Sequence, residues 1–158
     1  MTVDAAVDIS LQLDELTQQQ QQFERNLAHR LAVDAAGLAA MERLVRQGPA
    51  TPTELAHHLG ISTATTTLVI DRLEAAEHVT RSPHPTDGRK TVITAASRSA
   101  ETAYGYVEPL TSGIDRVAAA LTELERAHVT AFLRRVNAVY DDANRSLTTG
   151  RPTGVPER

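Results

Sequence analysis

The sequence predicts a mainly α fold in which two short helices and a β-hairpin lie between long helices at the two ends of the chain. A capping box at Thr51–Glu54 opens one short helix, and Ser62 opens the next one just after Gly60. A segment rich in turn residues, 83–89, separates two short stretches of β-forming residues. At both ends of the chain, apolar residues recur every three or four positions, which is the spacing of one helix face.

Composition limits the class of protein. The chain has 158 residues, about the size of one domain, and only 3% are aromatic, so we expect a core of Leu, Val, Ile and Ala. No apolar run approaches the roughly 18 residues that span a bilayer, and the first residues lack a signal-peptide pattern. The absence of Cys excludes disulfides and thiolate metal sites. We therefore expect a cytoplasmic protein that does not contact membranes.

Two helices are predicted before the short helix pair. The first covers residues 8–31, and the second begins at Asp34, a good N-cap, and ends before Gly48. The apolar face of the first helix consists of Ile9, Leu13, Leu16, Phe23, Leu27 and Leu31. The apolar side of the second consists of Leu38, Met41, Leu44 and Val45.

The short helices and the hairpin form a recognisable unit. Two short helices joined by a turn that contains glycine are a helix-turn-helix, and a hairpin directly after it is a wing. The two β-forming stretches are His78–Ser82 and Lys90–Thr94. Residues 34–98 are thus predicted to form a winged helix-turn-helix lobe, an architecture used to bind DNA.

Two long helices are predicted after the hairpin. Apolar residues at 107, 110, 114, 117 and 121 repeat with steps of three and four, and a similar series follows a cap at Thr122. Such narrow seams are typical of helices that pair with other helices. Because one small chain does not supply the partners, we expect residues 8–31 and 99–147 to form the dimerisation region of a homodimer. We expect Pro109 to kink the first of these helices, and residues 148–158 to be a disordered tail.

The second helix of the pair has a surface suited to DNA. Threonine is a poor helix former, but its hydroxyl can bond phosphates or base edges and its methyl can touch thymine. The candidate DNA contacts in this helix are Ser62, Thr63, Thr65 and Thr67, whereas Thr66 is expected in the core. The alternative is that these are neutral surface residues and that Ser62 only caps the helix.

Basic residues supply further candidates. Arg72 and Arg81 suit phosphate contacts, but a surface ion pair with Glu74 or another neighbour explains them equally well. The wing residues Arg89 and Lys90 are stronger candidates because they follow the turn of the hairpin.

The overall charge of the chain does not favour DNA binding. The formal net charge is −4, although residues 61–98 carry +1 and are the least acidic segment of the chain. This acidity favours an alternative function, a winged-helix module for protein–protein contact that has no role in DNA binding.

The sequence contains no recognisable motif of an enzyme active site or a metal site. We see no phosphate loop, no nucleophile elbow and no paired catalytic carboxylates with a partner histidine. His57 and His58 are adjacent, so they point in different directions on a helix and do not form an i, i+4 metal pair. We predict a protein that is not an enzyme and that needs no metal and no cofactor.

The helix-turn-helix and the wing resemble those of the MarR family of bacterial transcriptional regulators. The residues that carry the resemblance are Glu54-Leu55-Ala56, Leu59-Gly60-Ile61-Ser62, Asp71-Arg72-Leu73-Glu74, Val79, Arg81 and Asp87-Gly88-Arg89. The order of the predicted elements also matches, so the resemblance covers roughly residues 10–147. It implies a dimeric, sequence-specific regulator, most often a repressor, that binds a pseudo-palindromic operator in double-stranded DNA.

The resemblance also assigns roles in the wing. It implies that Arg89 enters the DNA minor groove, that Asp87 shapes the turn, and that Asp71 steadies the Arg89 guanidinium from the recognition helix. Relatives often respond to small aromatic or phenolic anions that bind between the dimer helices and the DNA-binding lobe. The sequence departs from the family pattern at Leu68, where a polar or basic residue is common, at Glu77, where glycine is usual, and at His78, where an apolar residue is usual. If Glu77 is left-handed, it costs on the order of 1 kcal/mol relative to glycine.

Overall fold

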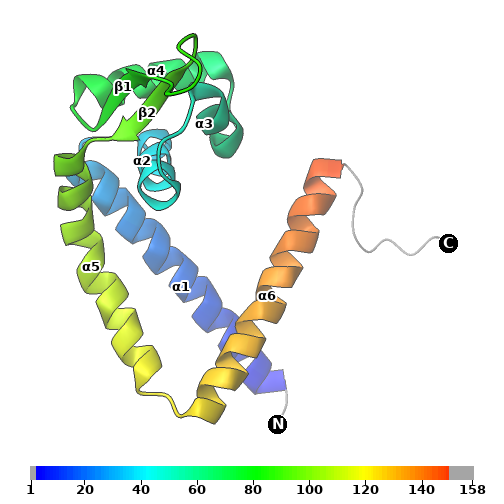
Figure 1. Cartoon of the computed structure of the whole chain (residues 1–158). Helices are drawn as coiled ribbons and strands as arrows, with labels where there is room; N and C mark the ends of the chain where they lie inside the picture. Colours follow the sequence, from blue (N-terminus) through cyan, green and yellow to red (C-terminus); the bar gives the residue numbers. More distant parts are fainter. Residues whose placement is uncertain (1–2, 150–158) are drawn as a thin grey trace. The chain divides into compact units, whose positions relative to one another are not determined.

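The structure is a computed structural model that describes residues 3–149, with the side chains of residues 8–148 (Figure 1). Its elements are α1 (Val3–Arg30), α2 (Ala35–Gln47), α3 (Pro52–Leu59), α4 (Thr63–Ala75), β1 (Val79–Pro83), β2 (Thr91–Ala95), α5 (Ser97–Ala119) and α6 (Glu123–Thr149). The strands β1 and β2 pair in antiparallel fashion, with Val79 opposite Ala95. The chain divides into two compact units, residues 1–108 and 109–158, and the division falls inside α5, at Pro109.

The fold class is the predicted one, but several bounds differ. Helix α1 begins at Val3, not at residue 8, and each strand lies one residue later than predicted. The strand shift arises because the Lys90 amide closes the wing turn by donating to the Asp87 carbonyl, 2.9 Å away, so that β2 starts after it. Helix α6 runs to Thr149, and the Thr148 hydroxyl donates to the Asn144 carbonyl, so the start of the predicted tail is helical. The rest of that tail, residues 150–158, lies outside the described residues.

Side-chain caps set the helix starts in the first unit, as predicted. The Asp34 carboxylate accepts from the Gly37 amide at 2.7 Å, and the Ser62 hydroxyl accepts from the Thr65 amide at 3.1 Å. The capping box at Thr51 is complete, since Thr51 and Glu54 bond each other's backbone amides. The hydrogen bond from the Thr51 backbone amide lowers the pKa of Glu54 below its ordinary value. Helix α3 ends at Gly60, whose φ of 65° is left-handed.

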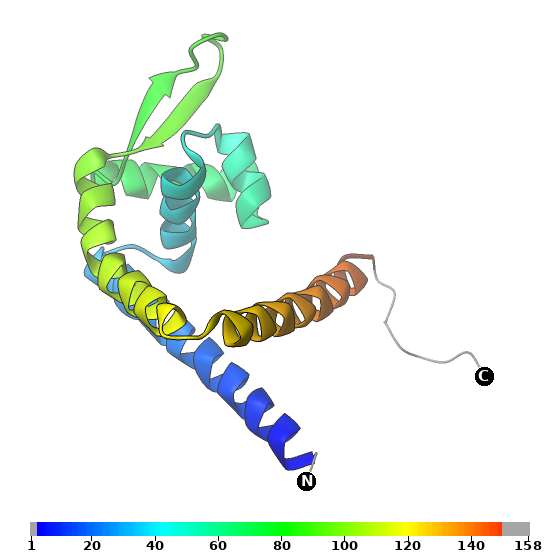
Figure 2. The same ribbon diagram turned by 60° about the horizontal axis from the view of Figure 1, so that its bottom comes forward.

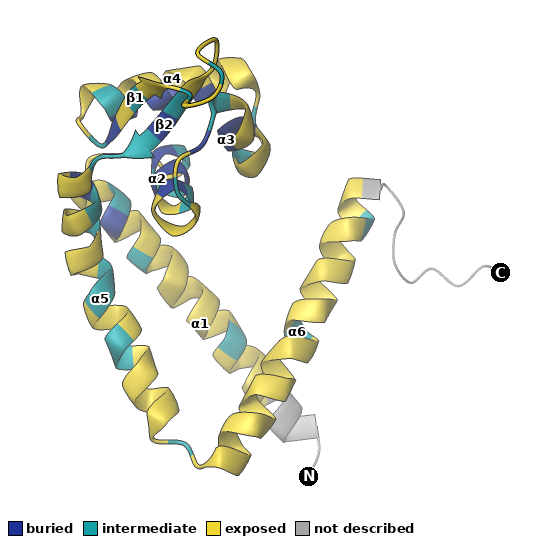
Figure 3. Ribbon diagram, viewed as in Figure 1, coloured by how far each residue is buried: buried dark blue, intermediate teal, exposed yellow. Residues whose placement is uncertain are grey.

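The core of the first unit lies where α2, α3, α4 and the sheet meet (Figure 3). Its most enclosed large side chains are Leu55, Ile70 and Ile93, each no more than 1% exposed. Ala50, just before α3, pairs with Ile93 of β2 through two backbone hydrogen bonds of 2.8 and 3.0 Å. This bridge adds a third backbone segment to the two-stranded sheet and ties the start of α3 to the wing.

Within the second unit, the second half of α5 and α6 leave their apolar side chains uncovered (Figure 3). Thr122 caps α6 together with Glu125, and the hydrogen bonds from Thr122 lower the pKa of Glu125. Ile114, Val117 and Tyr140 are each more than half exposed. Soluble chains rarely leave such stripes open. Among the described helices, none is long and apolar enough to cross a membrane.

His78 joins three elements of the first unit. Its Nε2 lies 2.8 Å from the carbonyl oxygen of Leu31, at the end of α1, and its Nδ1 lies 2.6 Å from the Ser99 hydroxyl in α5. A carbonyl only accepts, so Nε2 carries the hydrogen, and in the neutral ring Nδ1 accepts from Ser99. Glu77 before it has a φ of 59°, the left-handed conformation that the family pattern usually gives to glycine. The chain thus leaves α4 through a strained residue and is then held by the His78 imidazole.

We expect His78→Ala to lower the free energy of unfolding by about 1–3 kcal/mol, because it leaves the Leu31 carbonyl and the Ser99 hydroxyl without their partner. Chemical denaturation followed by circular dichroism measures the change. His57→Ala is the matched control, since His57 is exposed on α3, and it should stay within about 0.5 kcal/mol of the parent. Equal stability of the two variants would contradict a structural role for His78.

Candidate nucleic-acid interface

Helix α4 has one face in the core and the opposite face in solvent. Its buried residues are Thr66, Val69, Ile70 and Leu73, and Thr66 is fully enclosed as predicted. The candidate contacts in this helix, Ser62, Thr63, Thr65 and Thr67, are all exposed. The structure therefore brings the polar residues of this segment to the outer surface of the helix-turn-helix.

The hydroxyls of this surface already bond to one another or to the backbone. The Ser62 and Thr65 hydroxyl oxygens lie 2.9 Å apart, and the Thr67 hydroxyl donates to the Thr63 carbonyl at 3.0 Å. A hydroxyl that donates its hydrogen to a carbonyl still has lone pairs that can accept a hydrogen bond. Thr67 therefore presents an acceptor oxygen and a methyl group to solvent. At the start of the helix, the Thr63 and Ala64 amides precede the first intrahelical hydrogen bond and suit a phosphate oxygen.

Two of the basic candidates are engaged in ion pairs. Arg72 bonds Asp34, the N-cap of α2, at 2.7 Å. Arg81 of β1 bonds Asp71 at 2.5 Å and also pairs with Glu74, both of α4. The hydrogen bond to Asp71 is the largest cause that raises the pKa of Arg81 above its ordinary value.

These contacts correct one sequence-based expectation. Asp71 was expected to steady Arg89, but it holds Arg81 instead, because β1 passes directly beside the last turns of α4. Both Arg72 and Arg81 form the ion pairs that were the alternative to phosphate contacts, Arg72 with Asp34 and Arg81 with Glu74 as well as Asp71. Arg81 and Arg72 are thus placed as links between elements, with much of their charge matched by carboxylates.

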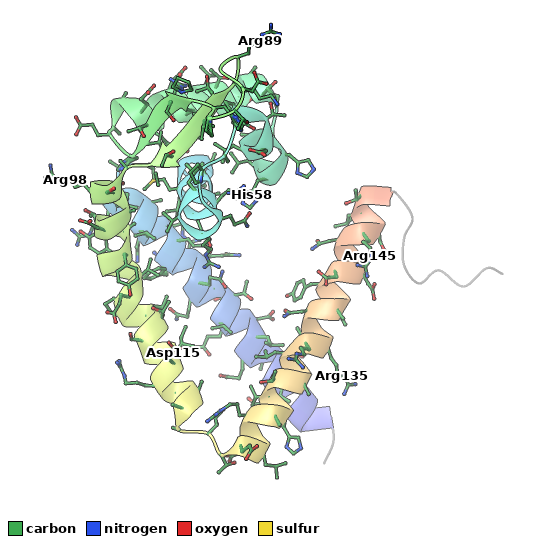
Figure 4. The ribbon with its side chains drawn as sticks, in the orientation of Figure 1. His58, Arg89, Arg98, Asp115, Arg135 and Arg145 are labelled. Atoms are coloured by element: carbon green, nitrogen blue, oxygen red, sulfur yellow. The ribbon has the colours of Figure 1, made fainter. Side chains whose placement is uncertain are left out.

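The wing turn is built around Asp87. The Asp87 carboxylate accepts from the Arg89 amide at 3.2 Å, and its carbonyl accepts from the Lys90 amide at 2.9 Å. The Lys90 ammonium lies 3.7 Å from the same carboxylate. The hairpin extends away from the helices of the first unit (Figure 2), and the labelled Arg89 lies at its tip (Figure 4). Among the described residues, no ion pair involves the Arg89 guanidinium, which is left exposed.

The exposed face of α4 also contains Ala64 and Ala75, which were not predicted as site residues, and Leu68, which was noted only as a departure from the family pattern. Ala64, Leu68, Asp71 and Ala75 recur every three or four positions and are all exposed. The signal was present, because this series lies opposite the buried Val69 and Leu73 on a helical wheel. The sequence-based candidates were chosen for hydroxyl or basic side chains, which excludes alanine and leucine.

Comparisons with known proteins agree with this geometry. Residues 33–91 match the model of the MarR family. The uncharacterised HTH-type transcriptional regulator YcgE of Bacillus subtilis (strain 168) is 29% identical over 120 residues, which cover 76% of this chain and 78% of that protein.

Solved structures show the same fold. The YusO protein of Bacillus subtilis superposes with a TM-score of 0.65 at 24% identity, covering 85% of this chain and 98% of that one. The F27L mutant of Staphylococcus aureus MepR, bound to an oligodeoxyribonucleotide, has a TM-score of 0.58 at 15% identity, covering 84% and 97%.

These comparisons show that the chain has a winged helix-turn-helix fold and that its helix-turn-helix segment is similar to those of MarR-family proteins. The family match covers residues 33–91, from just before α2 to the start of β2, so the resemblance to the MarR family lies in this part of the chain.

Proposed function

We propose that this protein is a DNA-binding transcriptional regulator and that it works as a homodimer whose two winged lobes bind the halves of a pseudo-palindromic operator. Residues 34–98 form the DNA-binding lobe, and residues 8–31 and 99–147 hold the dimer together. The uncovered apolar stripes support the second assignment, because a second copy offers each stripe a matching stripe under two-fold symmetry. Along α1, α5 and α6 the stripes include Ile9, Leu16, Leu110, Ile114, Val117, Val129, Leu133 and Tyr140, each at least 42% exposed.

The DNA contacts follow from the same arrangement. We assign Ser62, Thr63, Thr65 and Thr67 to the major groove and its phosphates, and Lys90 to the backbone beside the wing. Arg72 and Arg81 contribute less to phosphate binding, because Asp34, Asp71 and Glu74 already neutralise their positive charge. In a two-fold dimer, the recognition helices fit half-sites about one DNA turn apart, on the order of 10 base pairs.

The observation that carries this function is the free guanidinium at the tip of the wing. Arg89 is a cation of this lobe that is exposed and has no carboxylate partner among the described residues, whereas Arg72 and Arg81 are both paired. A guanidinium held at a hairpin tip suits the negative potential of a narrow minor groove, which attracts Arg at A·T-rich sequence.

A groove of about 510 Å³ between α1 and α2 supports a response to a small aromatic or phenolic anion. Val33 and Leu38 supply apolar walls, and Arg25 supplies a positive charge beside two glutamates. A ligand here would contact a dimerisation helix and the DNA-binding lobe together. We further propose that the bound dimer represses by occupying the operator, and that the ligand releases it.

We expect Arg89→Ala to unfold at the parent temperature and to lose about 1–3 kcal/mol of operator binding, because the side chain supports no contact within the fold. Fluorescence anisotropy across a salt series, on a duplex selected by the purified protein, measures the loss. Arg89→Lys keeps the charge but not the planar guanidinium, so it should recover binding only in part.

Arg98→Ala is the matched control, since Arg98 is exposed in the first turn of α5, away from the tip of the wing (Figure 4). It removes the same charge and should keep operator affinity. Unchanged affinity of Arg89→Ala at physiological salt would refute the wing contact.

The dimer has its own test. Light scattering at micromolar concentration should give twice the chain mass of 17.1 kDa. Ile114→Glu should lower that mass, because it places a charge in an apolar seam. Asp115→Asn changes the charge at the neighbouring exposed position and should leave the dimer intact. A parent protein that elutes as a 17.1 kDa monomer would rule out the assignment.

A further inference from the structure

Leu68 is an exposed apolar residue at the centre of the outer face of α4. Its side chain is 60% exposed, and it lies opposite the core residues Thr66, Val69 and Leu73. Because it is exposed, an aliphatic side chain at this position does not stabilise the lobe by packing in its core. We propose that Leu68 recognises thymine in the operator by packing on the C5-methyl group in the major groove, an inference that rests on the proposed DNA-binding function.

The groups around Leu68 favour apolar recognition over hydrogen bonding. Ala64, one turn before it, and Ala75, two turns after it, offer only methyl groups, so Leu68 has small apolar neighbours on this line of the helix. Small neighbours also let the helix approach the floor of the groove closely. Thymine alone among the four DNA bases presents a methyl group there, which makes an apolar contact selective for it.

The hydroxyl groups near Leu68 already form hydrogen bonds within α4 and its N-cap. Thr67 spends its hydroxyl hydrogen on the Thr63 carbonyl, and the Thr65 hydroxyl bonds Ser62. These hydroxyls are therefore held in place beside Leu68 and remain available to phosphates and base edges as acceptors.

One charged residue shares the same line, and its charge is compensated. Asp71 lies three positions after Leu68, where a bare carboxylate would repel the DNA backbone. Arg81 of β1 binds it at 2.5 Å and also pairs with Glu74, so the negative charge on this face is reduced. A contact with a protein partner is the competing use of Leu68.

The test exchanges single thymines for deoxyuridine in the selected operator. Deoxyuridine pairs as thymine does but lacks the methyl group, so only a methyl contact is lost. At one or two positions of each half-site, the parent protein should lose about fourfold in affinity per exchange, the scale of one buried methyl group. Leu68→Ala should bind the thymine operator more weakly and be insensitive to the exchange at those positions.

Two further variants complete the experiment. Val45→Ala, which trims an exposed aliphatic side chain on α2, should keep both the affinity and the sensitivity to deoxyuridine. Leu68→Gln should shift selection toward adenine, which glutamine can bond through two hydrogen bonds.

The outcomes separate the two proposals. Tight operator binding by the parent that is insensitive to deoxyuridine at every position would overturn the role of Leu68 and leave the proposed function standing. The absence of salt-dependent binding to any duplex would instead overturn the proposed function itself, and the role of Leu68 with it.

Discussion

The packing of α4 against the small core of the first unit is the constraint on which the interface depends. Val69, Ile70 and Leu73 are each at most 2% exposed, and they fix the rotation of the helix about its axis. A Cβ atom at Gly37 would lie 3.2 Å from Leu73 Cδ2, so α2 and α4 approach each other through a position that only glycine fills without displacement. Because the buried face of α4 is held against the core, the opposite face of this helix points toward solvent.

Electrostatics explains how an acidic chain presents a face to a polyanion. The carboxylates of Asp71 and Glu74 stand on α4 itself, and Arg81 bonds both of them from the wing. Exposed ion pairs of this kind add only about 0–1 kcal/mol to stability. Their larger effect is on the local field, because they remove negative charge beside the DNA and join the recognition helix to the hairpin. Arg89 at the tip of the wing has no ion pair among the described residues.

The sequence predicted those features of the fold that depend on near neighbours. Caps at Asp34, Thr51 and Ser62 lie within three residues of their partners, so local patterns identify the starts of α2, α3 and α4. Features made by distant residues were not predictable. The Ala50–Ile93 bridge and the contacts of His78 with Leu31 join residues more than 40 positions apart. In the candidate site, the exposed threonines followed from helix periodicity, whereas the partner of Asp71 depends on how β1 passes α4.

The central claim is that the outer face of α4 lies against the operator, and the absence of cysteine allows a direct measurement of it. Ala64→Cys places a single thiol at the middle of that face, and a photoreactive aryl azide attached to it reports what lies beside it. Illumination with the selected duplex should crosslink the protein to bases near the centre of each half-site. The same label at Val45→Cys on α2 should yield little crosslinking. Equal crosslinking from the two positions, or crosslinks from Ala64→Cys scattered evenly along the duplex, would contradict the account.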